Sequence, residues 1–236
     1  MAAQMSFNDA IAIVEQELTV EVARTPEQIP EAKQLRYRVY CEERGFGPGE
    51  DGIEQDEYDE NAIHVVVRGR ATDKVYGTVR VVQEQARRSW AGLSNGARLR
   101  GLRARTFAAA ATAEISRFAL TRDRSGLSPE ASALMRLYLM RGIVQVSGEL
   151  GLTHWCAIME KTLLRLLRST SMYFVPVGPA VEYQGLRQPA IFPLANGLER
   201  MRCENRPIWS LLTGGGTLWS EDIADRGTPH VQADAA

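Results

Sequence analysis

Cysteine and histidine are scarce in this sequence, with three of each among 236 residues. Cys41, Cys156 and Cys203 lie far apart and form no C-x-x-C pair, which argues against a zinc site or a redox dithiol. No cluster of His, Cys and Asp has the spacing of metal ligands, so we expect no metal ion. The three cysteines are expected to be packing thiols of a cytoplasmic protein.

Long apolar runs and a net charge of either sign are also missing. No stretch approaches the ~20 apolar residues that a membrane helix needs, and residues 1–16 lack the basic region of a secretory signal. The 28 basic and 29 acidic residues give a net charge of −1, which does not favour a general nucleic-acid binder. We expect a single domain over residues 1–220 and a flexible C-terminal tail over 221–236.

The charges are unevenly distributed along the chain. Residues 42–60 hold nine acids and one base, a sum of −8, whereas residues 84–127 hold nine arginines and three acids, a sum of +6. Such blocks are often solvated surface. The basic block can alternatively attract an acidic partner, and arginine suits phosphate or carboxylate because its planar group binds two oxygens at once.

Local patterns predict alternating strands and helices. Strands are expected at 18–23, 64–70, 75–83, 113–120, 153–159 and 172–177, with a further pairing segment from Val181 onward. Helices are expected at 26–43, 131–148 and 160–169. Residues 84–110 are interpreted as a lid, a binding insert or a disordered loop, and 197–220 as irregular. This order is typical of an α/β or α+β protein with a mixed sheet.

Opposite charges flank a glycine-rich turn near the N-terminus. Arg36 and Arg38 precede it, and Asp56 and Asp59 follow it. These residues form either surface ion pairs worth ~0–1 kcal/mol each or a partly buried network that closes a substrate pocket. Arg80 lies within an apolar strand, and if it points inward it needs a carboxylate that Asp56 or Asp59 can supply.

The strand at 113–121 carries polar residues on a face that is expected to be buried. Alternation places Glu114, Ser116 and Phe118 on one face, and Arg117 on the other. Glu114 either accepts a proton from an attacking amine or forms a salt bridge with a neighbouring arginine. The next segment contains Arg122, Arg124 and Gly126 before a helix start, a weak form of a phosphate-binding loop.

These motifs together resemble two related families. The order LRYRVYCEERGF (35–46), EQDEYD (54–59), GTVRVV (77–82) and EISRFAL (114–120) is similar to the autoinducer synthases, which make acyl-homoserine lactones. The matching positions are Arg36, Tyr40, Phe46, Asp56, Asp59, Arg80, Glu114 and Arg117. Tyr40 and Phe46 stand where that family usually has phenylalanine and tryptophan. The segments 154–169 and 177–194 instead resemble acyltransferases of PEP-CTERM/exosortase systems, which are similar to N-acyl amino acid synthases.

The resemblance implies the acyltransferase fold of the GNAT type, a central, mixed, mostly antiparallel twisted sheet flanked by helices. It implies transfer of a fatty acyl group from acyl carrier protein to the amine of a small substrate, without a bound cofactor. Glu114 would accept the proton, Arg117 would orient Glu114, and the thioester would lie beside Ser116 and Phe118. The phosphate of the 4'-phosphopantetheine arm would lie near Arg122, Arg124 and Gly126. The substrate pocket would be shaped by Arg36, Tyr40, Phe46, Asp56, Asp59 and Arg80.

Two other functions remain open at this point. The chain can be an acyl-homoserine lactone synthase that uses S-adenosylmethionine, or a non-catalytic module that binds acyl carriers or lipids. The departure from the autoinducer synthases after residue 150 favours the N-acyl amino acid synthase. Contact with a membrane surface is expected only through the product. Tyr183 and Arg187 either contact the acceptor carboxylate or pack a turn.

Overall fold

The computed structural model of the protein describes residues 5–46, 49, 51–83, 111–182 and 185–220. The tail at 221–236 and the insert at 84–110, both singled out in the sequence, lie outside these residues. The described strands form a sheet in the order β1-β2-β3-β4-β5-β8-β6, with β7 paired to β8. They are β1 (Leu18–Ala23), β2 (Ala62–Gly69), β3 (Val75–Val82), β4 (Thr112–Leu120), β5 (His154–Glu160), β6 (Val175–Pro176), β7 (Val181–Glu182) and β8 (Leu186–Pro193).

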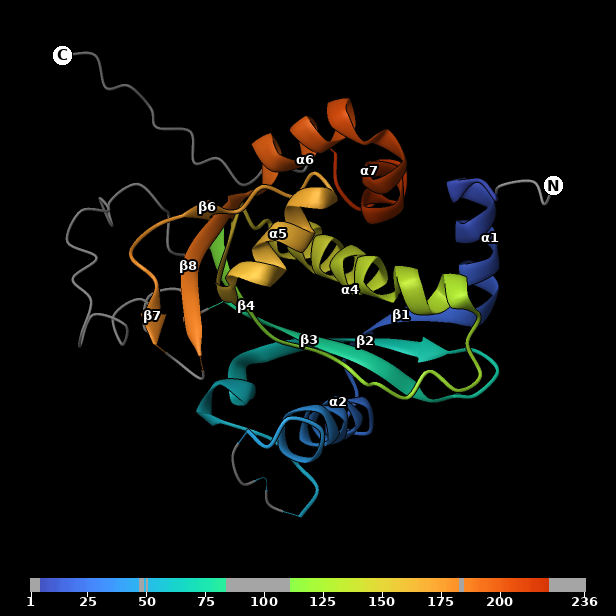
Figure 1. Ribbon diagram of the computed structural model, residues 1–236, viewed down its shortest axis with the longest axis vertical. Helices are drawn as coiled ribbons and strands as arrows, with labels where there is room; N and C mark the ends of the chain where they lie inside the picture. Colours follow the sequence, from blue (N-terminus) through green and yellow to red (C-terminus); the bar gives the residue numbers. More distant parts are fainter. Residues whose placement is uncertain (1–4, 47–48, 50, 84–110, 183–184, 221–236) are drawn as a thin grey trace.

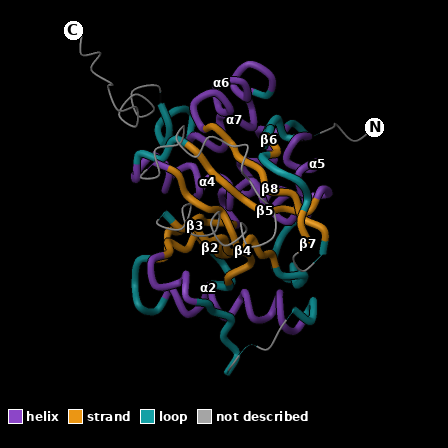
Figure 2. Tube along the Cα trace, turned by 90° about the vertical axis from the view of Figure 1, so that its left-hand side faces the viewer, coloured by secondary structure: helices purple, strands orange, loops and turns teal. Residues whose placement is uncertain are grey.

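Helices cover both faces of this sheet (Figures 1 and 2). One face carries α2 (Gln28–Tyr37), which continues into the π-helical turn η1 (Arg38–Glu42), and the short 3₁₀ helix η2 (Glu57–Asn61). The other face carries α1 (Phe7–Glu17), α4 (Pro129–Leu150), α5 (Lys161–Ser169), α6 (Leu194–Glu204) and α7 (Arg206–Thr213). Among the described strands only β4 and β5 pair in parallel, so the sheet is mixed and mostly antiparallel, which confirms the predicted fold class.

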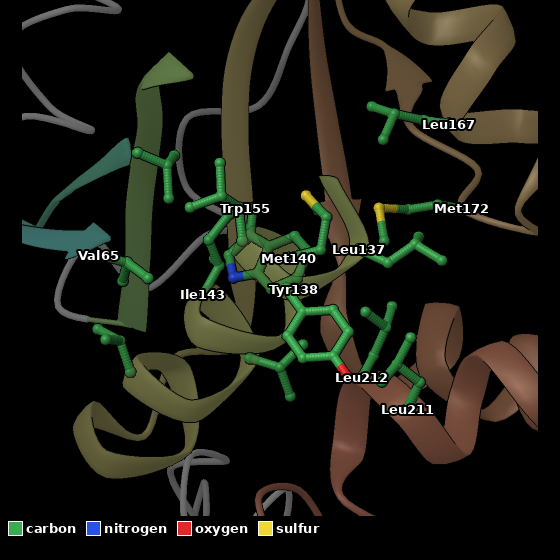
Figure 3. Close-up of a cluster of buried hydrophobic side chains, with 14 of the residues drawn as sticks. Val65, Leu137, Tyr138, Met140, Ile143, Trp155, Leu167, Met172, Leu211 and Leu212 are labelled. Carbon is green, nitrogen blue, oxygen red and sulfur yellow. The ribbon is translucent and has the colours of Figure 1, made fainter. Parts of the chain in front are cut away.

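The main apolar core lies between the sheet and α4 (Figure 3). Trp155 of β5 stacks on Phe192 of β8 at 5.2 Å between ring centroids, and its indole N–H donates to Ser147 Oγ at 2.7 Å. Gly142 lets α4 approach the sheet, because an added Cβ would lie 2.3 Å from Val65 Cγ1. The long central helix is thus held tightly against β1 and β2, since an added Cβ would also lie 2.8 Å from Val20 Cγ1.

The C-terminal part differs from the sequence prediction. Residues expected to be irregular form α6 and α7, because the Asn205 side chain accepts the N–H of Ile208 and Pro207 occupies the first turn of α7. The strand expected at 172–177 shrinks to the two residues of β6, whereas the longer β8 pairs along β5. Asn205 and Pro207 are standard helix-start residues, so α7 could have been found from the sequence.

The strands β4 and β5 part after a short ladder. Thr112–Glu114 pair with His154–Cys156, and beyond this point β4 pairs with β3 while β5 pairs with β8. Glu114 is therefore the last β4 residue of the parallel ladder. The segment 115–120 presents a strand edge without a ladder partner on the β5 side, within the described residues.

A β-bulge lies in the same segment of β4. The register with β3 shifts between Thr78 and Arg80, so that Arg117 and Phe118 both lie opposite Val79. Arg117 has a φ of 52°, in the left-handed region that residues with a Cβ rarely adopt. A bulge adds one residue to a strand and changes which face the following side chains occupy.

Candidate functional site

Six charged residues form a closed arginine–carboxylate ring on the α2 face of the sheet. Each arginine contacts two of the carboxylates, and each carboxylate contacts two of the arginines. In order around the ring the residues are Arg36, Glu54, Arg117, Asp56, Arg80 and Asp59. Three positive and three negative charges leave the ring neutral.

One side of the ring is buried in the protein. The side chains of Arg36, Asp59 and Arg80 are 0%, 2% and 2% exposed. Asp59 accepts from Arg36 Nη1 at 2.6 Å and from Arg80 Nη1 at 3.0 Å. Burial alone would raise the pKa of Asp59, but the hydrogen bonds and charge of Arg36, the Asp56 N–H and the charge of Arg80 hold that pKa well below its usual range.

The other side of the ring faces solvent in part. Arg117, Asp56 and Glu54 are 25%, 22% and 15% exposed. Arg117 Nε donates to Glu54 Oε1 at 3.0 Å, and its Nη2 donates to Asp56 Oδ2 at 2.8 Å. The ring supports the interpretation as a buried network over the interpretation as surface ion pairs.

The structure brings together the four residues that the sequence predicted to meet, Arg36, Asp56, Asp59 and Arg80. It adds Glu54, which the sequence analysis missed, although its place two residues before Asp56 in the EQDEYD motif offered a hint. The roles of these residues in substrate binding stay predictions.

Arg117 does not lie where strand alternation placed it. Without a bulge it would point away from Glu114, yet it reaches the carboxylates on the face that Glu114 and Ser116 share. Phe118, which alternation placed on the face of Glu114, instead packs against the main core on the other face of the sheet. No hydrogen bond or ion pair joins Arg117 to Glu114 among the described residues, and the predicted role of Arg117 in orienting Glu114 stays a prediction.

Glu114 is a half-buried carboxylate at the point where β4 and β5 part. Among the described residues it forms no hydrogen bond or ion pair, so the predicted alternative of a salt bridge with an arginine is not found there. The pKa of Tyr58 is raised mainly by its hydrogen bond with Glu57 and by burial. The negative charge of the nearby Glu114 raises that pKa further. As far as the structure describes the chain, Glu114 is thus an acceptor without a partner near the ring.

The remaining predicted pocket residues surround β4. Ser116 Oγ accepts from Arg80 Nε at 3.2 Å, which ties the strand to the ring. The Tyr40 hydroxyl donates to the carbonyl of Phe118 at 3.2 Å, and burial raises the pKa of that hydroxyl. The Phe46 N–H donates to the Tyr40 carbonyl at 2.7 Å across η1. Tyr40 therefore lies against the bulged segment, and π-helical turns like η1 are frequent at functional sites.

The predicted phosphate loop has few free donors. The N–H groups of Arg122, Asp123 and Ser125 bind side chains of the protein, and the Leu127 N–H binds a carbonyl. At the start of α4 the Ser128 N–H binds the Glu17 carboxylate at 2.8 Å, where an anion would otherwise sit.

The side chains of this loop are engaged in different ways. Arg124 donates to Met135 Sδ at 3.1 Å, while Arg122 is 78% exposed and lies 3.7 Å from Glu43. Gly126 has a φ of 83° and lies against Thr72 and Tyr76. The phosphate site at Arg122, Arg124 and Gly126 stays a prediction, with the two arginine side chains as its main donors.

His64 lies beside the ring but does not join it as a cation. Its Nε2 is 3.6 Å from Asp59 Oδ1, and neither ring nitrogen has a hydrogen-bond partner in the part of the chain that the structure describes. Burial lowers the pKa of His64 to about 4 in spite of the nearby carboxylate. The imidazole is therefore neutral at pH 7.

Within the described ranges, no group of His, Cys, Asp or Glu side chains is arranged to hold a metal ion. No helix in that part of the chain is long and apolar enough to cross a membrane. Arg187 pairs with Glu160 at 3.4 Å, and Tyr183 lies outside the described residues.

Comparison with known proteins identifies the fold. The sequence model of a family described as an acetyltransferase (GNAT) domain matches residues 35–128, the segment that holds the complete ring and Glu114. No curated protein sequence matches the chain. The matched segment is less than half of the chain, and the match agrees with a GNAT-like fold.

Solved structures of acyl-homoserine lactone synthases share the architecture. TofI, in a ternary complex with an inhibitor and MTA, matches with a TM-score of 0.58 and 21% identity over 78% of this chain and 96% of TofI. BjaI, a CoA-dependent acyl-homoserine lactone synthase with SAM and isopentyl-CoA, gives 0.61 and 20% over 80% of this chain and 88% of BjaI. At these identities the likeness establishes the GNAT fold alone.

FeeM, an N-acyl amino acid synthase from uncultured soil microbes, also matches. It gives a TM-score of 0.49 and 13% identity over 78% of this chain and 94% of FeeM, which is too weak to support a conclusion about activity. The predicted resemblance to PEP-CTERM/exosortase acyltransferases is not tested by these matches.

Proposed function

We propose that this protein is an N-acyltransferase that moves a fatty acyl group from an acyl carrier protein thioester to the amino group of an amino acid. The observation that carries the proposal is the Glu114 carboxylate, which has no partner in the described part of the chain and lies where β4 parts from β5. The GNAT domain match over residues 35–128 supports acyl transfer as the reaction class.

The parting of the strands suits a thioester arm. Half of the backbone N–H and C=O groups of β4 point to the β5 side, and buried groups of this kind need partners. The amides of a pantetheine arm can supply them in the way that an added strand does. A backbone N–H of the bulged segment would then polarise the thioester carbonyl. We expect Arg122 and Arg124 to meet the phosphate of the arm.

In the reaction, the amine nitrogen attacks the thioester carbonyl carbon and the carbon–sulfur bond breaks. Glu114 accepts the proton that the amine loses, directly or through a water molecule. The departing thiolate takes up a proton and remains on the carrier protein. The ring fixes β4 from the α2 side, because two consecutive residues of this strand, Ser116 and Arg117, form side-chain hydrogen bonds within it.

The experiment is a product analysis with purified protein. The protein is incubated with a mixture of amino acids and acyl carrier protein loaded with fatty acyl groups, or with acyl-CoA in a parallel arm, and the organic extract is analysed by mass spectrometry. An N-acyl amino acid is the expected product. Formation of a lactone when S-adenosylmethionine is added would assign the protein to lactone synthesis, and acyl-carrier binding without any product would indicate a binding module.

Glu114→Gln tests the proposed base. The variant keeps the size of the side chain and removes the charge, so kcat is expected to fall by about 10²- to 10⁴-fold. Glu60→Gln is the matched control, since Glu60 is an exposed acid on η2 and lies outside the ring. Full turnover in Glu114→Gln would show that the catalytic assignment is wrong.

A further inference from the structure

The arginines of the ring use their guanidinium groups in two different ways. Arg36 donates from both terminal nitrogens, Nη1 and Nη2, to the two oxygens of Asp59, at 2.6 and 3.0 Å. Arg80 donates in the same manner to the two oxygens of Asp56, with Nη2 at 3.1 Å. In both residues a carboxylate therefore fills the terminal pair of donors, a bidentate geometry that favours arginine–carboxylate pairing.

Arg117 has no carboxylate across this terminal pair: Nη1 has no acceptor among the described residues, and Nη2 carries two N–H groups, of which one is used for Asp56. Its two hydrogen bonds come from Nε and Nη2, which lie along the side of the guanidinium, and they go to Glu54 and Asp56. Arg117 is also the most exposed arginine of the ring, at 25% against 0% and 2% for the other two. The ring therefore holds the Arg117 side chain in place and leaves room on it for one more carboxylate.

The bulge decides what lies next to this terminal donor pair. It turns Arg117 to the face of β4 that carries Glu114, a carboxylate that has no partner among the described residues. The ring is neutral, so a simple anion gains little from it and is repelled by Glu114. A zwitterion is complementary to both groups, because its carboxylate can meet Arg117 while its ammonium meets Glu114.

We propose that the terminal Nη1 and Nη2 of Arg117 bind the α-carboxylate of the acceptor, so that the preferred acceptor is a free α-amino acid held with its amino group toward Glu114. This inference rests on the proposed function and adds the group that selects the acceptor. Glu54 acts as a positioning residue, since it holds Nε of Arg117 and thereby aims the terminal pair.

The test compares acceptors that differ only at the carboxyl group. Wild-type protein is assayed with its best amino acid, with the carboxamide of that amino acid and with the amine that lacks the carboxyl group. Loss of a charged hydrogen-bonded contact is expected to lower kcat/KM about 10- to 150-fold for the two analogues. Equal use of the amino acid and its carboxamide would overturn the inference and leave the proposed function standing. If no amine is acylated, the proposed function itself fails.

Arg117→Lys separates recognition from structural damage. Lysine keeps the charge but loses the planar donor pair, so the preference for the amino acid over its carboxamide should fall toward one. Damage to the fold would lower turnover with both acceptors equally. Arg24→Lys is the control, since it alters an ion-paired arginine elsewhere, at Glu149, and should keep the wild-type preference.

The Michaelis constants give a second readout. Arg117→Lys should raise KM for the acceptor and leave KM for the acyl donor unchanged. A rise in KM for the donor alone would assign the terminal pair to the phosphate of the thioester arm and overturn the inference. The comparison of acceptors on the wild-type protein stands even if this variant fails to fold.

Discussion

Asp59 is the most deeply buried carboxylate of the arginine–carboxylate ring, and Asp59→Asn measures how much that burial matters. The side chain is 2% exposed and accepts hydrogen bonds from Arg36, Arg80 and the Asp56 N–H. Asparagine has nearly the same shape, so the variant removes a negative charge without opening a cavity. It leaves two buried arginines with one carboxylate fewer between them.

Breaking a buried ion pair from one side costs ~3–5 kcal/mol, whereas a surface pair is worth ~0–1 kcal/mol. With a slope of about 2.5 kcal/mol per M of urea, a loss of about 4 kcal/mol lowers the unfolding midpoint by about 1.6 M. The measurement is urea unfolding at pH 7, followed by tryptophan fluorescence and by circular dichroism, whose transitions should coincide. At this pH the carboxyl group of Asp59 is fully ionised, because its pKa is lowered.

Asp73→Asn is the matched control. Asp73 also pairs with an arginine, Arg68, at 3.4 Å, but its side chain is 90% exposed. Its replacement should leave the urea midpoint within experimental error of wild type. The reasoning about burial is refuted if Asp59→Asn lowers the midpoint no more than Asp73→Asn does.

Two further predictions concern the surroundings of the ring. Burial lowers the pKa of His64 to about 4, so the unfolded chain binds the proton more readily and stability falls as the pH drops from about 6.5 toward 4. Between pH 7 and pH 5 this amounts to about 2 kcal/mol, which urea midpoints should show in wild type and which His64→Gln should largely remove. An unchanged loss in His64→Gln would point to other groups. Gly142→Ala should lower the melting temperature, since the new Cβ would lie 2.3 Å from Val65 Cγ1 and 2.8 Å from Val20 Cγ1. Overpacking of ~1–3 kcal/mol exceeds the ~1 kcal/mol that alanine gains in a helix, and calorimetry that finds a higher melting temperature would contradict this.

The sequence predicted most of the elements that place the site. Strands β1 to β5 and the long helix α4 follow from β-branched runs, proline and glycine positions and helical spacing, all of which act over a few residues. The sequence also indicated a partner for Arg80: an arginine that points inward from the apolar strand β3 needs a carboxylate, which Asp56 or Asp59 could supply.

Other features depend on contacts between distant segments. The sequence did not place β8 beside β5, because strand order is set by packing rather than by local preference. Nor did it include Glu54 in the ring, since neighbouring acids in the EQDEYD stretch look alike until the turn after α2 orients them.

The amino-acid sequence by itself indicated which charged residues need a partner of opposite charge and which strand carries the candidate base. The tertiary structure alone decided the direction in which Arg117 points. Strand alternation has a period of two, so a single extra residue reverses every following side chain. The bulge opposite Val79 adds that residue and brings Arg117 to the face of Glu114. It exists only because β4 is paired with β3, a contact that no local pattern in the sequence records.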